Sequence, residues 1–484
     1  MTSDDVLHET DALQLRRSLG LVDVTLFFII AGSNLQWVAT AAAAGPSSLP
    51  VWLIGAAGLF VPLAIVVVFL SSRYPDEGGL YVWSKRAFGP FAGFITGWTY
   101  WTSNLPYFPA LLYFTAGNAL FILGANTGSL SKSPLYFIVI ALLGLALATA
   151  LNVFGLDVGK WLNNIGAASR WLTTLLLIAL GALAWWRFGP ATHITVHTMR
   201  PGLHVKDLVF WSTIAFAWTG LEAVSFMSGE IKDPRRTVPR GLAIAAPVIA
   251  AIYLLGTASV LAALPPQKVS GLYGVMQAVG HVATSNGWFF LTPIAAILVT
   301  ISCLGSVGAW LGAVARIPFV AGIDRYLPEA FGKMHPRWGS PVAPLLTQAA
   351  IAGLVIILSQ GGTTVAGAYD VLVSTTVLIT MLPFLFLFAS AIKLCGERSA
   401  ENGVRSAAGR LTISAAAAVG LLTTLISMAL ATLPAADEPN KAFAVTKIIG
   451  MTAIMVGSGV AVFVIGGRRK RAADLQDSAT IPGL

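Results

Sequence analysis

The chain has 484 residues, of which 56% are hydrophobic and only 11% are charged, whereas soluble domains carry about a quarter charged residues. Its formal net charge of +9 does not indicate a nucleic-acid partner, because the basic residues lie in short segments between apolar runs. Two distant cysteines, Cys303 and Cys395, exclude a disulfide framework and a cysteine-based metal site. The composition therefore predicts a protein embedded in lipid.

The chain contains about twelve apolar runs close to the length of about 20 residues that a membrane-spanning helix needs. In chain order these runs are residues 22–44, 50–70, 88–122, 134–155, 158–186, 208–229, 241–262, 288–314, 342–358, 367–393, 409–432 and 444–466. We therefore expect an all-α polytopic membrane protein with about twelve transmembrane helices.

The basic residues predict how the chain lies in the membrane, since lysine and arginine concentrate in cytoplasmic loops. With the N-terminus inside, 22 of the 30 basic residues fall in inside segments, 7 fall in outside segments, and Arg170 lies within a span. This bias predicts a multi-pass protein of the cell membrane with both termini in the cytoplasm.

Two spans carry polar interruptions at corresponding depths. The first span reads LFFIIAGSNLQWVATAAAAG and contains Gly32-Ser33-Asn34, and the sixth reads FWSTIAFAWTGLEAVSF and contains Thr219-Gly220. Glycine and serine alone would fit close helix packing, but the asparagine adds a side-chain dipole that hydrocarbon rejects. Unpaired backbone at this depth is tolerated only where it lines a cavity. Matched interruptions in two halves point to the substrate site of an inverted-repeat transporter.

Three motifs occur along the chain. Tyr74 to Trp101, with the sequence YPDEGGLYVWSKRAFGPFAGFITGWTYW, combines an acidic-Gly-Gly-x-Tyr turn, a basic pair and Phe-Gly-Pro. Phe216 to Arg240 and Arg316 to Pro341 hold the other two. In this order they resemble the signature of the amino acid–polyamine–organocation (APC) transporters, over roughly residues 15 to 395. The third helix, with PALLYF at residues 109–114, is most similar to the glutamate/γ-aminobutyrate antiporter branch, and polyamine carriers are the near rival.

The resemblance implies a LeuT-like fold of ten helices in two inverted five-helix repeats, followed by two accessory helices. The implied divisions are a cytoplasmic tail at 1–20, a first repeat at 21–186, a second repeat at 206–395, accessory helices at 405–466 and a cytoplasmic tail at 467–484. It also implies a secondary active transporter, a permease or antiporter, that moves amino acids or related amines by alternating access.

In such carriers the first broken helix presents N–H groups to the substrate carboxylate, and the sixth presents carbonyls to the amine. Phe216 is either an aromatic gate over the substrate or a packing residue, and Asn34 stands where the family usually has a small residue. The expected substrate-binding residues are Ile30, Gly32, Ser33, Asn34, Asn104, Phe216, Ala217, Trp218, Thr219 and Gly220.

Two ionisable residues are placed well inside spans, where such groups are costly and usually functional. Arg170 resembles the basic residue that sodium-independent relatives carry at the former sodium site, and its permanent charge would replace the ion. Glu222 can titrate and is expected to gate or couple transport. The alternative for each is a buried pair or a side chain that reaches the interface. Ser302 and Cys303 either line the remnant of that cation site or, as we prefer, are packing residues.

Other function classes find little support. The sequence has no phosphate-binding loop and no zinc-protease motif, so we expect no enzyme activity, no cofactor and no metal. A neutral amino acid is the electrostatic default, because glutamate would need another basic group and polyamines would need several carboxylates. A polyamine or organic-cation carrier and a non-transporting amino acid sensor are the alternatives. The expected partners are the small-molecule substrate and the lipid bilayer, and a homo-oligomer is left open.

Overall fold

The computed structural model describes residues 19–74, 78–124, 128–154, 156–202, 205–318, 326–396, 407–434, 438 and 440–479. These residues are helical almost throughout and none of them forms a strand, although one isolated parallel bridge joins Leu19 to Ile231. The predicted all-α class is confirmed. Most of the predicted N-terminal tail, residues 1–18, lies outside the described residues.

The helices follow one another with short connections. The first half contains α2 (Leu21–Gly32), α3 (Leu35–Ala44), α4 (Ser48–Gly55), η1 (Ala56–Phe60), α5 (Val61–Arg73), α6 (Leu80–Phe88), α7 (Pro90–Ala119), η2 (Leu120–Ile122), η3 (Leu130–Lys132), α8 (Pro134–Val153) and α9 (Leu156–Phe188). The second half contains α10 (Val205–Ala217), η4 (Leu221–Glu230), α11 (Pro234–Ala263), η5 (Pro266–Lys268), α12 (Gly274–Ser285), α13 (Leu291–Val314), η6 (Glu329–Gly332), α15 (Val342–Ser359), α16 (Val365–Gly396), α17 (Ala407–Ala431) and α18 (Lys441–Ala479).

Within the described residues, ten helices are long and apolar enough to cross a membrane, or eleven when the bent pair α2–α3 is counted as one span. The remaining predicted span, 208–229, is divided between α10 and the 3₁₀ helix η4. The 13 residues of α10 reach only about 20 Å, so α10 alone cannot cross a hydrocarbon core of about 30 Å. The protein is a multi-pass membrane protein, as predicted.

Two helices were not predicted, because neither resembles a span. The nine residues of α6 bury Trp83 and Ala87 and expose Lys85 and Arg86, which makes it an amphipathic helix inside the segment that we expected to be a loop. The 12-residue helix α12 lies between the spans α11 and α13. The last helix, α18, also continues to Ala479, beyond the predicted end of the last span at residue 466.

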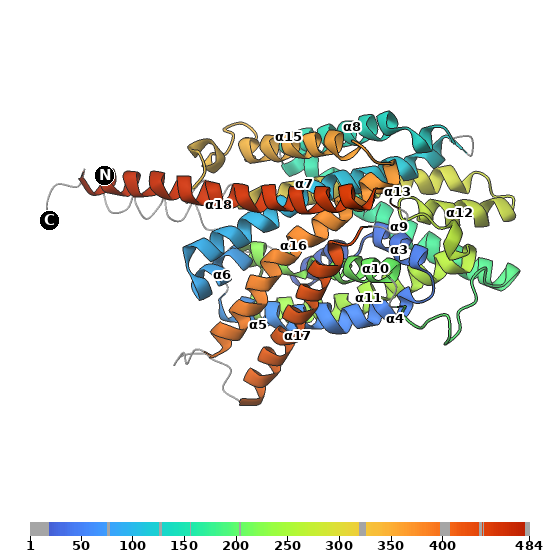
Figure 1. The fold of residues 1–484 in the computed structure, drawn as a ribbon, viewed down its shortest axis with the longest axis horizontal. Helices are drawn as coiled ribbons and strands as arrows, with labels where there is room; N and C mark the ends of the chain where they lie inside the picture. Colours follow the sequence, from blue (N-terminus) through green and yellow to red (C-terminus); the bar gives the residue numbers. More distant parts are fainter. Residues whose placement is uncertain are drawn as a thin grey trace.

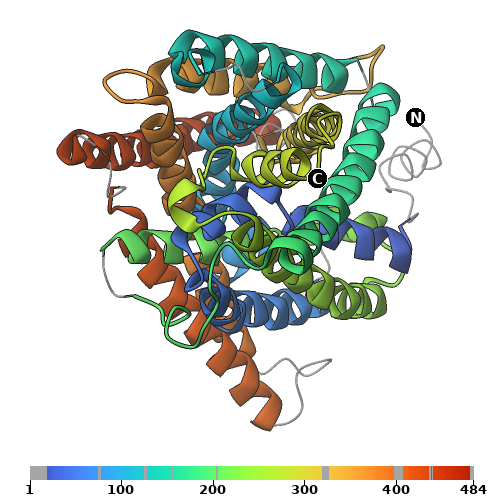
Figure 2. The same ribbon diagram turned by 90° about the vertical axis from the view of Figure 1, so that its right-hand side faces the viewer.

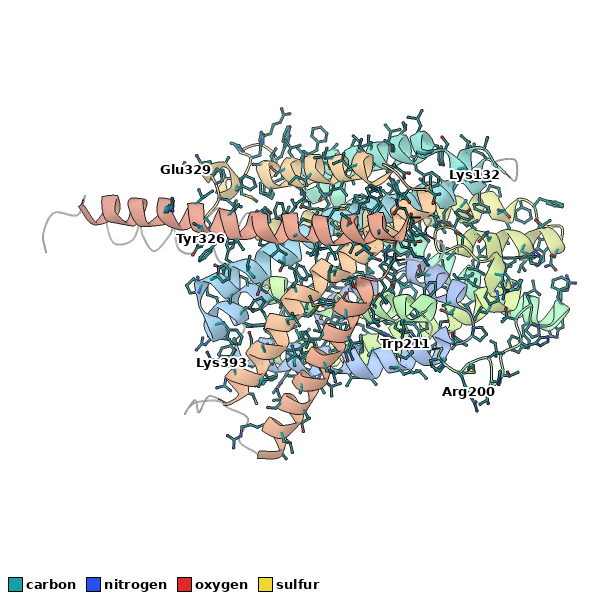
Figure 3. The ribbon with its side chains drawn as sticks, in the orientation of Figure 1. Lys132, Arg200, Trp211, Tyr326, Glu329 and Lys393 are labelled. Atoms are coloured by element: carbon teal, nitrogen blue, oxygen red, sulfur yellow. The ribbon has the colours of Figure 1, made fainter. Side chains whose placement is uncertain are left out.

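The broken helices lie inside the bundle. Figure 1 shows α3 and α10 next to each other near its middle, and these two helices are in contact. In contrast, α17 projects from the lower edge of the bundle in Figure 1, and α17 and α18 both lie at its edge in Figure 2. Figure 3 places Lys132 and Arg200 at one end of the molecule and Glu329 and Lys393 at the other. The residues predicted to lie on opposite sides of the membrane are therefore separated.

Candidate functional site

The first break lies between α2 and α3, whose axes differ by 41°. Ser33 and Asn34 connect the two helices in extended conformation. The Asn34 side chain lies at the N-cap of α3, with Oδ1 3.5 Å from the Gln36 N–H, and its Nδ2 donates to Tyr107 Oη at 2.9 Å. Asparagine is a favoured N-cap residue because its oxygen can accept from unpaired N–H groups of the first turn. Asn34 thus starts the second half-helix and ties it to α7.

The second break separates α10 from η4 at Trp218–Gly220. Thr219 donates to the Phe216 carbonyl through both its backbone N–H, at 2.9 Å, and its hydroxyl, at 2.8 Å. Gly220 has φ +109°, a conformation that side chains strain. A Cβ at this position would lie 2.7 Å from the Ala31 carbonyl oxygen. The second break is therefore in direct contact with the backbone of the last turn of α2, beside the first break.

A tyrosine of α11 joins the two breaks. The Tyr253 hydroxyl accepts a hydrogen bond from the Asn34 N–H at 3.3 Å and donates to the Ala217 carbonyl at 3.0 Å. Its ring stacks on Trp52 with 4.2 Å between centroids and 8° between planes. One hydroxyl thus pairs a donor freed at the first break with an acceptor freed at the second. Tyr253 was not predicted, because a tyrosine in an apolar span is by itself ordinary.

Replacing Tyr253 by phenylalanine is expected to lower the initial rate of uptake about tenfold, because two buried backbone groups lose a partner. The stacked ring on Trp52 is retained, so we expect folded protein in ordinary yield. Uptake into liposomes, normalised to monodisperse protein, measures the effect. Wild-type uptake by the variant would show that the breaks do not depend on this hydroxyl.

Arg170 of α9 is buried and points into the bundle. Its Nη1 donates to the carbonyls of Ile30 and Ser33 at 2.7 and 2.8 Å. These are carbonyls of the last turn of α2 and of the first break. The charge therefore faces the negative end of the half-helix α2, where a cation is favoured. The alternative that the side chain reaches the membrane interface is wrong.

Arg170 also binds α13, where its Nε is 3.5 Å from Ser302 Oγ and its Nη2 donates to Ser306 Oγ. We preferred packing for Ser302, but the structure places its hydroxyl against the guanidinium. Ser306 was not among the predicted residues, although it lies one helical turn after Ser302 on the same face. The guanidinium links α9, α13 and the first break.

Glu222 lies at the start of η4 and is almost fully buried, with 1% of its surface exposed. Its two carboxyl oxygens have different partners. Oε1 accepts from the Tyr100 hydroxyl at 3.0 Å, and Oε2 accepts from the Gly220 N–H at 2.8 Å. The carboxyl group therefore connects α7 to the second break, and it is the one acidic side chain among the described residues that line the central cavity.

The breaks open onto this central cavity, which has an empty volume of about 600 Å³. Its lining residues, in chain order, are Ile30, Ala31, Ser33, Asn34, Trp37, Tyr100, Ser103, Asn104, Tyr107, Arg170, Phe216, Ala217, Thr219, Gly220, Glu222, Tyr253, Ser306, Trp310, Thr376 and Thr380. Phe216 packs edge-on against Trp37 at 5.3 Å. The Asn104 Nδ2 donates to the Tyr100 carbonyl at 2.8 Å, within its own helix.

Ten of the twelve residues named in advance for the site line this cavity. The exceptions are Gly32, where a Cβ would meet Ile249 at 2.8 Å, and Trp218. The Trp218 indole is buried and its Nε1 donates to the Trp52 carbonyl at 3.1 Å. These two residues do not line the cavity, and instead they pack against neighbouring residues beside the breaks. In the part of the chain that the structure describes, no three residues of the types His, Cys, Asp and Glu are grouped to hold a metal ion.

A family model for amino acid permeases matches residues 18–456. This chain belongs to the amino acid permease family. An uncharacterized transporter of Legionella pneumophila is 27% identical to the permease over 429 residues, which are 88% of the permease and 92% of the relative. The probable agmatine/putrescine antiporter AguD of Lactococcus lactis is 26% identical over 325 residues, 66% of the permease and 68% of AguD.

Among solved structures, the crystal structure of MhsT in complex with L-phenylalanine superposes with a TM-score of 0.57 at 14% identity, over 86% of the permease and 99% of MhsT. This similarity confirms the predicted LeuT-like fold. Together with the family match and the transporter relatives, it confirms the predicted function at the level of its class, which is a secondary transporter.

Proposed function

We propose that this permease binds a neutral amino acid or a small amine between the two breaks and moves it by alternating access. The observation that carries the proposal is that both breaks meet at one buried cavity. The positive end of α3 would receive a carboxylate near Ser33 and Asn34. Carbonyls of the second break would receive the amine, and Phe216 with Trp37 would cover the substrate. Each break interrupts the first span of one predicted repeat, the repeats being residues 21–186 and 206–395.

The charges in the cavity favour a substrate without net charge. The Arg170 guanidinium donates to protein oxygens, and the Glu222 carboxyl accepts from protein donors. With one basic and one acidic side chain among its described lining residues, the cavity has no excess of either charge for a glutamate or a diamine. A small organic cation is the second candidate, because Glu222 lies in the cavity and a relative is a probable agmatine/putrescine antiporter.

Uptake and exchange by purified protein in liposomes test the proposal. Radiolabelled neutral amino acids, glutamate, agmatine and putrescine are offered outside, with and without unlabelled substrate inside. We expect saturable uptake of one neutral amino acid, increased by internal substrate. Binding without uptake of any compound would favour the sensor alternative, and preferential exchange of agmatine or putrescine would favour the organic-cation carrier.

We expect transport to be independent of sodium, because Arg170 brings a permanent positive charge to the place between the first break and α13. Its donors already bind the Ile30 and Ser33 carbonyls and the hydroxyls of Ser302 and Ser306. Replacing external sodium by choline in the liposome assay should leave the uptake rate unchanged. A strict requirement for sodium would contradict this role of Arg170.

Glu222 is proposed to gate transport through its protonation state. Glutamine should fit this site, because its carbonyl can accept from the Gly220 N–H and its amide can donate to the Tyr100 oxygen, which can turn its hydrogen away. We expect Glu222→Gln to flatten the dependence of uptake on pH and to slow net transport more than substrate binding. Uptake measured over roughly pH 4 to 8, a range that begins near the ordinary pKa of a free glutamate, tests this. An unchanged pH profile would leave Glu222 with a structural role.

We also propose that the protein lies in the cell membrane with both termini in the cytoplasm. Basic residues are concentrated on that side in the sequence, and residues assigned to opposite sides lie at opposite ends of the molecule (Figure 3).

A further inference from the structure

A second cavity lies on the outside of the bundle, between α5, α11 and α17. Its empty volume is about 1270 Å³, on the measure that gives the central cavity about 600 Å³, and it shares no lining residue with the central cavity. Its wall includes small or apolar side chains from all three helices, among them Ala64, Val68, Leu242, Ala243, Ala246 and Ile413. We call it the α5–α11 groove. The groove is hollow partly because alanines, which have small side chains, line it on both α5 and α11.

The shape of the groove fits an extended hydrocarbon chain. Its lining residues on α5 run from Val61 to Arg73, which is about 18 Å of helix. This length is close to half of the hydrocarbon core of a bilayer, about 15 Å. The groove therefore follows one leaflet, with apolar walls along most of its length.

One end of the groove is basic. Arg73 is its one charged residue among the described lining residues, and its guanidinium lies over the Tyr74 ring at 5.5 Å. Arg86 lies over the same ring at 4.3 Å. Two guanidinium groups are thus gathered around one aromatic side chain at the end of α5.

The other two helices carry arginines near the ends that are predicted to lie on the same side of the membrane as Arg73. Arg240 precedes the lining residue Ala243 by three positions, and Arg410 precedes Ile413 by three. Residues three apart share a helix face, and both arginines are exposed. Guanidinium groups bind phosphate oxygens well, and basic residues at the end of a span attract anionic lipids.

We propose that the α5–α11 groove binds one anionic phospholipid, with an acyl chain along α5 and the phosphate among the arginines at its basic end. The lipid belongs to the inner leaflet, which rests on the orientation proposed above. A zwitterionic phospholipid could fill the apolar part equally well but would gain less from the basic end. The positive charge at the basic end therefore gives the groove its selectivity for anionic over zwitterionic phospholipids.

The full-length protein is reconstituted in equimolar phosphatidylglycerol and phosphatidylcholine, extracted in mild detergent, and examined by native mass spectrometry. We expect one phosphatidylglycerol retained per protein. Ala243→Trp fills the groove and should reduce retention about tenfold, because apolar contacts with the acyl chain are lost. Arg240→Gln combined with Arg410→Gln should abolish the preference for phosphatidylglycerol.

Two control variants match these changes. Leu143→Trp alters a lipid-facing position on α8, where Leu143 is 62% exposed, and Lys132→Gln with Arg200→Gln removes two charges at the opposite end (Figure 3). Both should behave as wild type. Equal retention of the two lipids by wild type would mean adventitious lipid only and would overturn the proposal, as would undiminished retention by Ala243→Trp. If that variant does not fold, an undiminished preference in the double arginine variant overturns it. Lipid retention is measured without any transport assay. A failure of the transport proposal would therefore not decide the lipid proposal, and the two outcomes can be distinguished.

Discussion

Uptake is expected to fall by about a hundredfold when Gly220 is replaced by alanine. The backbone at this position has φ +109°, which costs a residue with a side chain about 1–3 kcal/mol. The added Cβ would also lie 2.7 Å from the Ala31 carbonyl oxygen. Because that atom belongs to the backbone of α2 beside the first break, it cannot rotate away, and the second break must move away from α2. Initial uptake in liposomes, normalised to folded protein, measures the loss.

Gly457→Ala is the matched control for this change. Gly457 lies on the peripheral helix α18, and a Cβ there would meet nothing within 4 Å. Alanine in place of glycine within a helix is neutral or stabilises by up to about 1 kcal/mol, so uptake should equal that of wild type. Normal uptake by Gly220→Ala would show that the second break need not touch α2 during transport.

The second large effect is expected at Arg170. Replacing it by glutamine leaves the Ile30 and Ser33 carbonyls and two serine hydroxyls of α13 without their charged donor. Hydrogen bonds to charged groups contribute about 1.5–3 kcal/mol each, so we expect the folded protein to lose more than about 3 kcal/mol. Uptake should fall by at least about a hundredfold.

The loss at Arg170 is followed by thermal unfolding and by uptake of the same preparation. Arg187→Gln is the control, since Arg187 lies on the same helix but near its end, where it binds the Asn286 side chain in an exposed position. That variant should retain wild-type uptake. If the Arg170→Gln protein unfolds at the wild-type temperature and takes up substrate at the wild-type rate, the guanidinium is required for neither stability nor transport.

Much of the fold could be predicted from hydropathy, because a span needs a long apolar run and the loops between spans are short. The exceptions show the limits of that rule. The helix α6 is too short and too charged to register as a span, although Trp83 and Ala87 bury one of its faces. Hydropathy predicted the sixth span as one continuous helix, although its backbone divides into α10 and η4.

The candidate site was predictable where polar or charged residues interrupt the apolar spans. Glycine beside polar residues in spans indicated both breaks, and charges at depth indicated Arg170 and Glu222. Tyr253 and Ser306 were not predictable from such signals, because tyrosine and serine are ordinary in spans. Their roles depend on which faces of α11 and α13 turn toward the breaks, and this follows from packing between distant segments.

The guanidinium held by α9 has a further consequence for energetics. A sodium ion that binds and leaves carries electrochemical work from its own gradient into the transport cycle. A charge bonded covalently to the chain stays on the protein and returns with it, so it brings stability to the break but no driving force. Any accumulation of substrate would then be powered by an outgoing counter-substrate or by protons, and the direction of net flux would follow their gradients.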